Sequence, residues 1–226
     1  MIAMKKIFCL IAFLSVTFVN IFALAEEKPV VAVINFGQYD GAVTDALVID
    51  NIGAMSADYI IQALVESNYF QVVSTHDLQN SPELQDVKLS GIIPPSTARK
   101  IAAVLGIKYV LYGNVSGVSG SSTSLEVIGS GGTVHTVKAQ VIARMMDVET
   151  GEIVAAVKGV GSSKSSLVKA GIESAGYIKI GTQTVSQVSV HNAVKKASYS
   201  MVGMLLERLY DLSPKQVEKI FKDKLK

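Results

Sequence analysis

Hydrophobic residues in the first half of the chain recur with the spacing of alternating strands and helices. Residues 29–36 are a β-branched run that predicts a buried strand. Residues 37–53 have no steady period and carry turn residues, which predicts a loop. Apolar residues then recur at helical spacing from Ala54 and end near Ser67-Asn68, and residues 69–74 predict a second strand.

A third strand follows a polar, proline-containing connection over residues 77–95. Ser96 is a suitable N-cap for a helix, and Gly106 is a suitable stop at its C-terminal end. Residues 107–117 then predict the strand. The order strand, helix, strand, helix, strand indicates an α/β protein in which helices pack on a sheet.

Beyond that point the period changes to two. Residues 137–145 alternate between apolar and polar side chains, residues 147–152 supply a turn, and residues 153–161 return as a strand. The stretches 120–135 and 162–189 on either side are rich in Gly and Ser, and strand continues on both sides of each, which argues against linkers. Alternation over residues 124–141 is restored by a register shift, for instance a bulge, near Gly131-Gly132.

Two helices are expected at the C-terminal end of the chain. Apolar residues recur at helical spacing over residues 190–210. A short basic helix then begins at Ser213-Pro214, since Ser suits the N-cap and Pro the first helical position.

The N-terminal residues have the order of a secretory signal peptide. Lys5 and Lys6 precede an apolar run over residues 7–22, and Ala-Leu-Ala at 23–25 ends it before Glu26. We expect cleavage between Ala25 and Glu26, so that residues 1–25 leave; the alternative is an uncleaved membrane anchor, because the run is just long enough to cross a bilayer. Both interpretations place the remainder in an exported location.

Cleavage changes the chemistry that is available. Cys9, the single cysteine, leaves with the signal, so disulfides and thiolate chemistry are not expected. The full chain has 21 Lys+Arg against 19 Asp+Glu, and removal of two lysines makes the balance even. Nucleic-acid binding therefore loses its main electrostatic support.

No catalytic or cofactor-binding constellation is found. Gly129, Gly131 and Gly132 lead into a strand rather than a helix, which argues against a phosphate loop. The histidines at 76, 135 and 191 have no second ligand at metal-binding spacing, and His135 is expected to be an exposed polar residue. Residues 166–169 match S-x-x-K without the companion motifs of that chemistry. We expect no enzyme activity, no cofactor and no metal site.

The order of these segments resembles the curli secretion channel family (CsgG-type). The segments that carry the resemblance are "VVAVINF", "ALVESNYFQVVS", "IAAVLGIKYVLYGNVSG", "IGSGGTVHTVKAQVIARMMDVETGEIV" and "NAVKKASYSMVGMLLERL". The most specific part is residues 128–154, where glycines, strand and a D-x-x-T-G-E turn coincide.

The resemblance implies an architecture and a function. It implies an α/β domain over residues 26–226, with a mixed sheet and packed helices similar to anticodon-binding-like folds, and C-terminal helices over 190–226. It also implies two hairpin segments, 117–141 and 157–188, that insert as strands of a barrel shared by a ring of subunits in the outer membrane. The pore constriction would correspond to a loop with Val43, Leu47 and Val48.

Two functions follow and remain open at this point. The first is a homo-oligomeric periplasmic or outer-membrane component that exports curli-like extracellular protein. The second is a soluble periplasmic module that regulates an envelope protein partner without forming a pore. The channel's lipid-anchored cysteine is replaced here by Glu26, and the second hairpin segment carries Lys164, Lys169, Glu173 and Lys179. On a lipid-facing strand a charge costs about 2–4 kcal/mol at mid-membrane.

Overall fold

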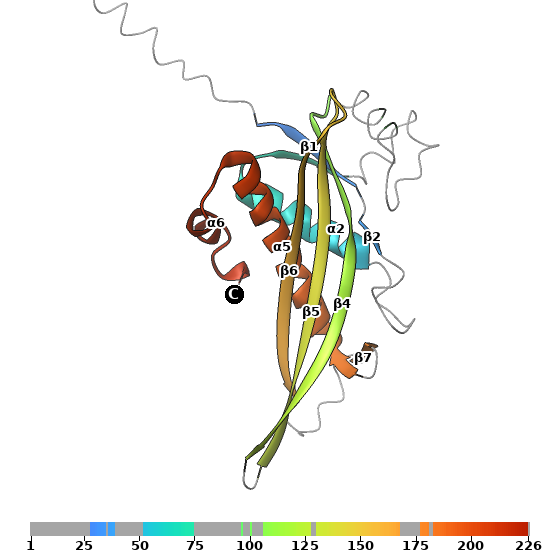
Figure 1. Ribbon diagram of the computed structural model, residues 1–226, viewed down its shortest axis with the longest axis vertical. Helices are drawn as coiled ribbons and strands as arrows, with labels where there is room; N and C mark the ends of the chain where they lie inside the picture. The colour runs from blue at the N-terminus through green and yellow to red at the C-terminus, as the bar shows by residue number, and fades with distance from the viewer. Residues whose placement is uncertain are drawn as a thin grey trace, which may run out of the picture.

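The sheet of this protein combines short parallel strands with three long antiparallel ones. The computed structural model describes residues 28–34, 36–38, 52–74, 96, 100, 106–127, 130–167, 177–180 and 183–225 (Figure 1). Its six-stranded sheet has the order β3-β1-β4-β5-β6, with β2 paired to β4. The strands are β1 (Val30–Val33), β2 (Gly37–Gln38), β3 (Gln71–Ser74), β4 (Tyr109–Val127), β5 (Ser130–Asp147) and β6 (Ile153–Leu167).

Strand direction divides this sheet into two parts. β1 lies parallel to both β3 and β4, and β2 is also parallel to β4. β4, β5 and β6 form an antiparallel meander, as hairpin-connected strands do. A separate hairpin is made by β7 (Tyr177–Ile180) and β8 (Gln183–Ser186). The predicted mixed sheet is confirmed.

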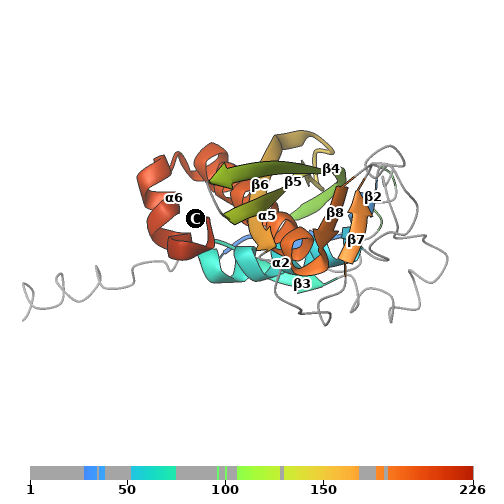
Figure 2. The ribbon, with the colours of Figure 1, turned by 90° about the horizontal axis from the view of Figure 1, so that it is seen from below.

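Two of the described helices cover one face of the sheet. α2 (Ile52–Ser67) connects β2 to β3, and α5 (Gln187–Tyr210) follows β8 directly. Figure 2 shows α5 between the strands β4–β6 and α2. α6 (Pro214–Phe221) begins where the sequence predicts: Pro214 takes the first helical position, and the backbone N–H of Ser213 donates to Gln216 Oε1 at 2.8 Å. A short 3₁₀ turn, Lys222–Lys224, follows.

The long strands divide their side chains between two environments. On β5, Val137, Ala139, Val141, Ala143 and Met145 are all fully buried and belong to one apolar cluster with residues of α2 and α5. This is the predicted alternation, and it is confirmed. A smaller cluster on the opposite face of the sheet joins Ala32, Ile34, Ile107, Val110, Tyr112 and Met146.

Helix α5 approaches the backbone of β6 unusually closely. A Cβ atom built on Gly159 would lie 2.0 Å from the carbonyl oxygen of Ala197, and one built on Gly161 would lie 2.2 Å from that of Ala193. No real side chain fits at such distances, so both positions require glycine. The two glycines therefore allow the helix backbone to lie directly on the strand.

A side-chain hydrogen bond network closes the turn between β5 and β6. Asp147 Oδ1 accepts hydrogen bonds from the backbone N–H of Glu149 at 2.9 Å and of Thr150 at 3.0 Å. Gly151 has a φ of +76°, a conformation that glycine adopts at little cost. The predicted hairpin turn is confirmed.

Several sequence predictions about element boundaries were wrong. The pairing of β4 with β5 is regular across Gly131 and Gly132, and the register shift lies instead between Val115 and Gly117. The predicted loop over 37–53 contains β2 at its start and the first residues of α2 at its end. The Gly/Ser-rich stretch 120–135 is strand apart from residues 128 and 129, which lie outside the described residues. Residues 120–127 pair with β5, and residues 133–135 pair with both β4 and β6, so backbone hydrogen bonds that the side-chain pattern does not reveal hold this stretch.

The predicted helix after Ser96 lies largely outside the described residues. Ser96 and Lys100 are both helical. Gly106 follows with a φ of +62°, as a C-terminal helix stop requires.

β6 forms one edge of the sheet, and a side chain protects part of it. Arg208, in the last turn of α5, donates from Nη1 to the carbonyl oxygen of Ala156 at 3.2 Å. That bond satisfies one edge carbonyl that would otherwise be open to another strand. Among the described residues, no helix has the combination of length and apolar character needed to cross a membrane.

Candidate functional site

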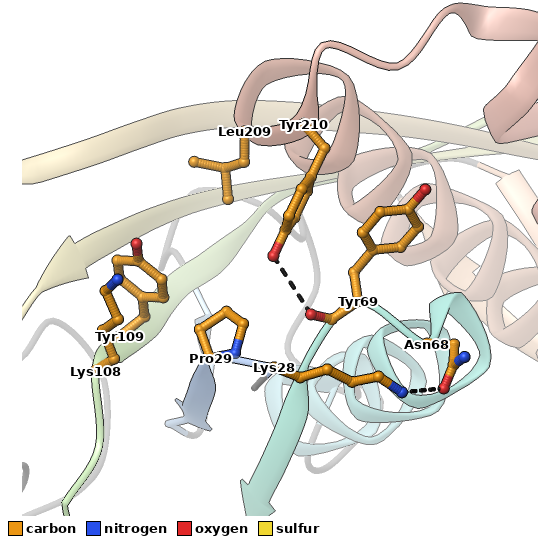
Figure 3. A pocket seen from close by; sticks show the side chains of 8 residues that line it. All are labelled: Lys28, Pro29, Asn68, Tyr69, Lys108, Tyr109, Leu209 and Tyr210. Carbon is orange, nitrogen blue, oxygen red and sulfur yellow. Dashed lines mark hydrogen bonds between the residues drawn. The ribbon is translucent and has the colours of Figure 1, made fainter. Parts of the chain in front are cut away.

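A cleft lies where the first described residues of the chain meet the end of α5. Its volume is about 430 Å³, within the size range of small-molecule sites. Figure 3 shows side chains from four parts of the chain around it. The lining residues are Lys28, Pro29, Asn68, Tyr69, Lys108, Tyr109, Leu209 and Tyr210.

Aromatic contacts build one wall of the cleft. The rings of Tyr69 and Tyr210 have centroids 4.6 Å apart, and the Tyr210 hydroxyl donates to the backbone oxygen of Tyr69 at 3.3 Å. The rings of Phe70 and Tyr210 form a second, edge-on contact, with centroids 5.6 Å apart. These contacts join the end of α5 to the connection between α2 and β3.

The polar groups of the cleft are mainly cationic. Lys28 Nζ donates a short hydrogen bond to Asn68 Oδ1, and Lys108 Nζ lies 5.3 Å from the centre of the Tyr109 ring. None of the lining residues is acidic. The cleft therefore suits an anion better than a cation. It holds no nucleophile with a base beside it, so its described residues offer no catalytic constellation.

A second candidate surface is the side of β4–β6 that faces away from α5, here called the open face. Its charged residues are Lys138 and Arg144 on β5 and Lys158 and Lys164 on β6, all exposed. No ion pair joins any of the four to a carboxylate among the described residues. Residues 112–123, 134–146 and 154–164, which supply the open face, contain no Asp or Glu. The open face is thus uniformly cationic.

A titratable cluster lies between α2, α5 and the C-terminal end. Tyr199 is fully buried, and its ring packs edge-on against Phe221 with centroids 5.3 Å apart. Burial, and after it the neighbouring Glu66 carboxylate, raises the pKa of Tyr199 well above its ordinary value. Lys224 Nζ pairs with Glu66 at 3.4 Å. A phenol that stays protonated and inaccessible is a structural group and not a general acid or base.

His135 was expected to be exposed, and the structure contradicts this. Only 9 % of its surface is accessible, and its Nδ1 is buried without a hydrogen-bond partner among the described residues. It shares the helix-facing side of β5 with Val137, two residues further along the strand. The prediction failed because the helix-facing side of β5 stays covered beyond the clearly apolar run.

The predicted pore-constriction and cleavage-site residues stay predictions. Val43, Leu47 and Val48 lie outside the described residues, as do Ala25 and Glu26. No group of three or more potential metal ligands occurs within the described ranges.

Sequence reasoning missed both candidate surfaces. The cleft joins residues that are far apart in the chain and share no motif. A signal for the open face did exist: Lys138 and Arg144 both occupy even positions of an alternating strand, opposite the apolar odd ones.

The family model for the curli production assembly/transport component CsgG matches residues 18–225, which is nearly the whole chain. The chain belongs to the CsgG family. Membership supports a non-enzymatic component of the cell envelope, and it accounts for the order of strands and helices that the resemblance implied. No curated protein matches this CsgG-family chain.

Solved structures similar to this CsgG-family chain include an LpoB domain, a hypothetical protein and a lipoprotein. The LpoB C-terminal domain from Escherichia coli is 26% identical, with a TM-score of 0.37, over 59% of this chain and 82% of that one. The hypothetical protein CT253 from Chlamydia trachomatis is 14% identical, with a TM-score of 0.47, over 82% of this chain and 99% of that one. Lipoprotein GNA1162 from Neisseria meningitidis is 17% identical, with a TM-score of 0.39, over 65% and 88%.

Proposed function

We propose that this CsgG-family chain is an exported, non-catalytic assembly module that acts as a folded domain on the periplasmic side of the envelope. It contacts an envelope protein partner or exported cargo and associates with further copies of itself. In this function the meander β4–β6 stays packed on α5 and does not enter a membrane.

The observation that supports this most is the burial of four apolar side chains within the first hairpin segment, 117–141. Val118, Val137, Ala139 and Val141 are at most 6 % exposed and lie in the same cluster as the apolar side chains of α5. Withdrawing the hairpin would expose these side chains, at about 1.5–3 kcal/mol for each valine. Insertion would also remove the strand partner of β6 over much of its length.

The self-association in this proposal is supported by the edge of the sheet. β6 is a 15-residue edge strand, and such an edge is a template for another chain. Arg208 already donates a hydrogen bond to the edge carbonyl of Ala156. The partner copy would therefore engage the strand beyond that point.

Fractionation of producing cells tests the proposal. We expect the chain to leave the membrane fraction after a high-salt wash, to run as a defined oligomer by light scattering, and to give no conductance in planar bilayers. Retention after the wash, release only by detergent, and stable conductance steps would contradict it.

A channel subunit is the second candidate, and one specific observation favours it. β4 and β5 have 19 and 18 residues, whereas a membrane-crossing strand needs about 9–11. In Figure 1 the C-terminal end of β4 and the paired start of β5 extend beyond the helices. The conductance measurement separates this candidate from the first, because only the channel subunit conducts ions.

A further inference from the structure

The four cations of the open face are arranged as two like-charged pairs. Lys138 is opposite Ser162 in the register, so Lys164 is its diagonal neighbour on β6. Arg144 is opposite Ala156, so Lys158 is its diagonal neighbour in the same sense. Diagonal side chains on adjacent strands lie about 7–8 Å apart, within range of mutual repulsion.

We propose that the open face binds an anionic membrane surface through lipid headgroups. This goes beyond the proposed function, because it requires only the folded sheet and neither a protein partner nor a pore. Headgroup phosphates relieve the repulsion within each pair, for which the described residues provide no carboxylate. Each Lys or Arg near such a surface contributes about fivefold to binding.

The shape of the open face fits a surface rather than a small anion. The two pairs are separated by six residues along the strands, which corresponds to about 20 Å at 3.3 Å per residue. On the β4 side of the face the residues beside Lys138, at 117, 119 and 121, are Gly, Ser and Ser, and Tyr112, which lies opposite Arg144, is buried. The long lysine side chains can therefore all reach one plane.

The residue types favour lipid over an acidic protein. Three of the four cations are lysine, which is depleted at the cores of protein interfaces, where Arg and aromatic residues are enriched. Tyr112, the aromatic residue at the upper end of the face, is only 6 % exposed. Val160, between Lys158 and Ser162, is 48 % exposed, which adds an apolar contact among the lysines.

Vesicle cosedimentation tests the proposal on the full chain purified from the envelope of producing cells. One set of vesicles contains phosphatidylglycerol and phosphatidylcholine in equal parts, and the other contains phosphatidylcholine alone. The difference between the two sets isolates charge from any apolar attraction of the N-terminal residues. We expect binding to the anionic set only, and release when salt is raised from about 0.1 to 1 M, where the Debye length falls from ~10 to ~3 Å.

A pair of variants with equal charge assigns the binding to this face. The first is Lys138→Gln, Lys158→Gln and Lys164→Gln together. The second removes three lysines that are also exposed but lie in the C-terminal helical region, by Lys215→Gln, Lys219→Gln and Lys222→Gln. The first variant is expected to bind the anionic vesicles on the order of 100-fold more weakly. The second is expected to bind within a few-fold of the parent. Circular dichroism and urea unfolding check that both remain folded.

Three outcomes would overturn the proposal. The parent chain could fail to bind anionic vesicles at low salt, which would leave an acidic protein as the partner that suits the charge. The open-face variant could bind as tightly as the parent. The C-terminal variant could lose binding to the same extent, which would assign the contact to α6 or to net charge.

Discussion

Neighbouring residues of β6 meet opposite surroundings. Gly159 and Gly161 lie against the backbone of α5. Lys158 and Val160, which alternate with these glycines along the strand, face solvent. Because side chains alternate along a strand, one face of β4–β6 holds the domain together and the other is available for contacts. Stability and binding are thus assigned to alternate positions of the same strands, and substitutions should separate them.

Gly159→Val is expected to have the largest effect. Its Cβ would collide with the carbonyl oxygen of Ala197, a backbone atom that cannot move without displacing α5. We expect a loss of about 5 kcal/mol in the free energy of unfolding, comparable to the whole stability of a small domain. Urea denaturation measures it. Ser162→Val on the open face is the control and should change stability by less than about 0.5 kcal/mol. Equal losses would show that the two faces are not distinct.

Met145→Ala should destabilise the covered face by removing volume. Met145 is fully buried, and a Met→Ala change in a core costs about 2–5 kcal/mol. The adjacent change Arg144→Ala removes a longer side chain from the open face and should cost less than about 0.5 kcal/mol. Thermal unfolding of both variants compares them. A cost for Arg144→Ala as large as for Met145→Ala would mean that the open face is packed.

Ser198→Ala tests the polar contact beneath the covered face. Ser198 Oγ lies 3.1 Å from Ser56 Oγ, and both side chains are fully buried between α5 and α2. Removing one hydroxyl leaves the other without that partner, at about 1–2 kcal/mol. Ser162→Ala, on the open face, should be neutral in the same denaturation assay. A neutral Ser198→Ala would show that this hydrogen bond adds nothing to stability.

Lys158→Gln is expected to have the smallest effect and the opposite sign. It removes the repulsion between Lys158 and its diagonal neighbour Arg144, so the free energy of unfolding should rise by roughly 0.2–0.5 kcal/mol. The gain should shrink at high salt, as screening weakens the repulsion in the parent. Denaturation at two salt concentrations measures it, and a loss of stability would indicate a favourable contact of Lys158.

The sequence predicted the part of the fold where side-chain chemistry alternates clearly. Residues 137–145 gave the correct buried face, and Ser213-Pro214 gave the correct start of α6. Periodicity alone ended β4 near residue 117, because Gly and Ser carry no periodic signal and their strand depends on pairing with β5; only the family resemblance predicted a hairpin segment over 117–141. The bulge was misplaced for the same reason: the glycines at 131 and 132 pair regularly, and the shift occurs at Ser116.

The candidate surfaces depended on contacts across the fold. Nothing in the sequence around Gly159 and Gly161 shows that the backbone of α5 packs directly against them. The cleft needs Tyr69 and Tyr210, which are distant in the chain, to come together. Local pattern contains no information on such contacts, and the cleft and the close approach of α5 to β6 could not have been predicted from it.

The turn at Asp147 also bears on the order in which the chain folds. β5 and β6 meet across this short turn, and β4 meets β5 across residues 128 and 129, so the meander is made from contacts between chain neighbours. The pairing of β1 with β3 and β4 joins Val31 to Val72 and Tyr109, which are distant in the sequence. Closing long loops slows folding, whereas local hairpins close in microseconds. The strands β4–β6, which carry both the covered and the open face, are therefore expected to form first, because their loops cost the least entropy to close.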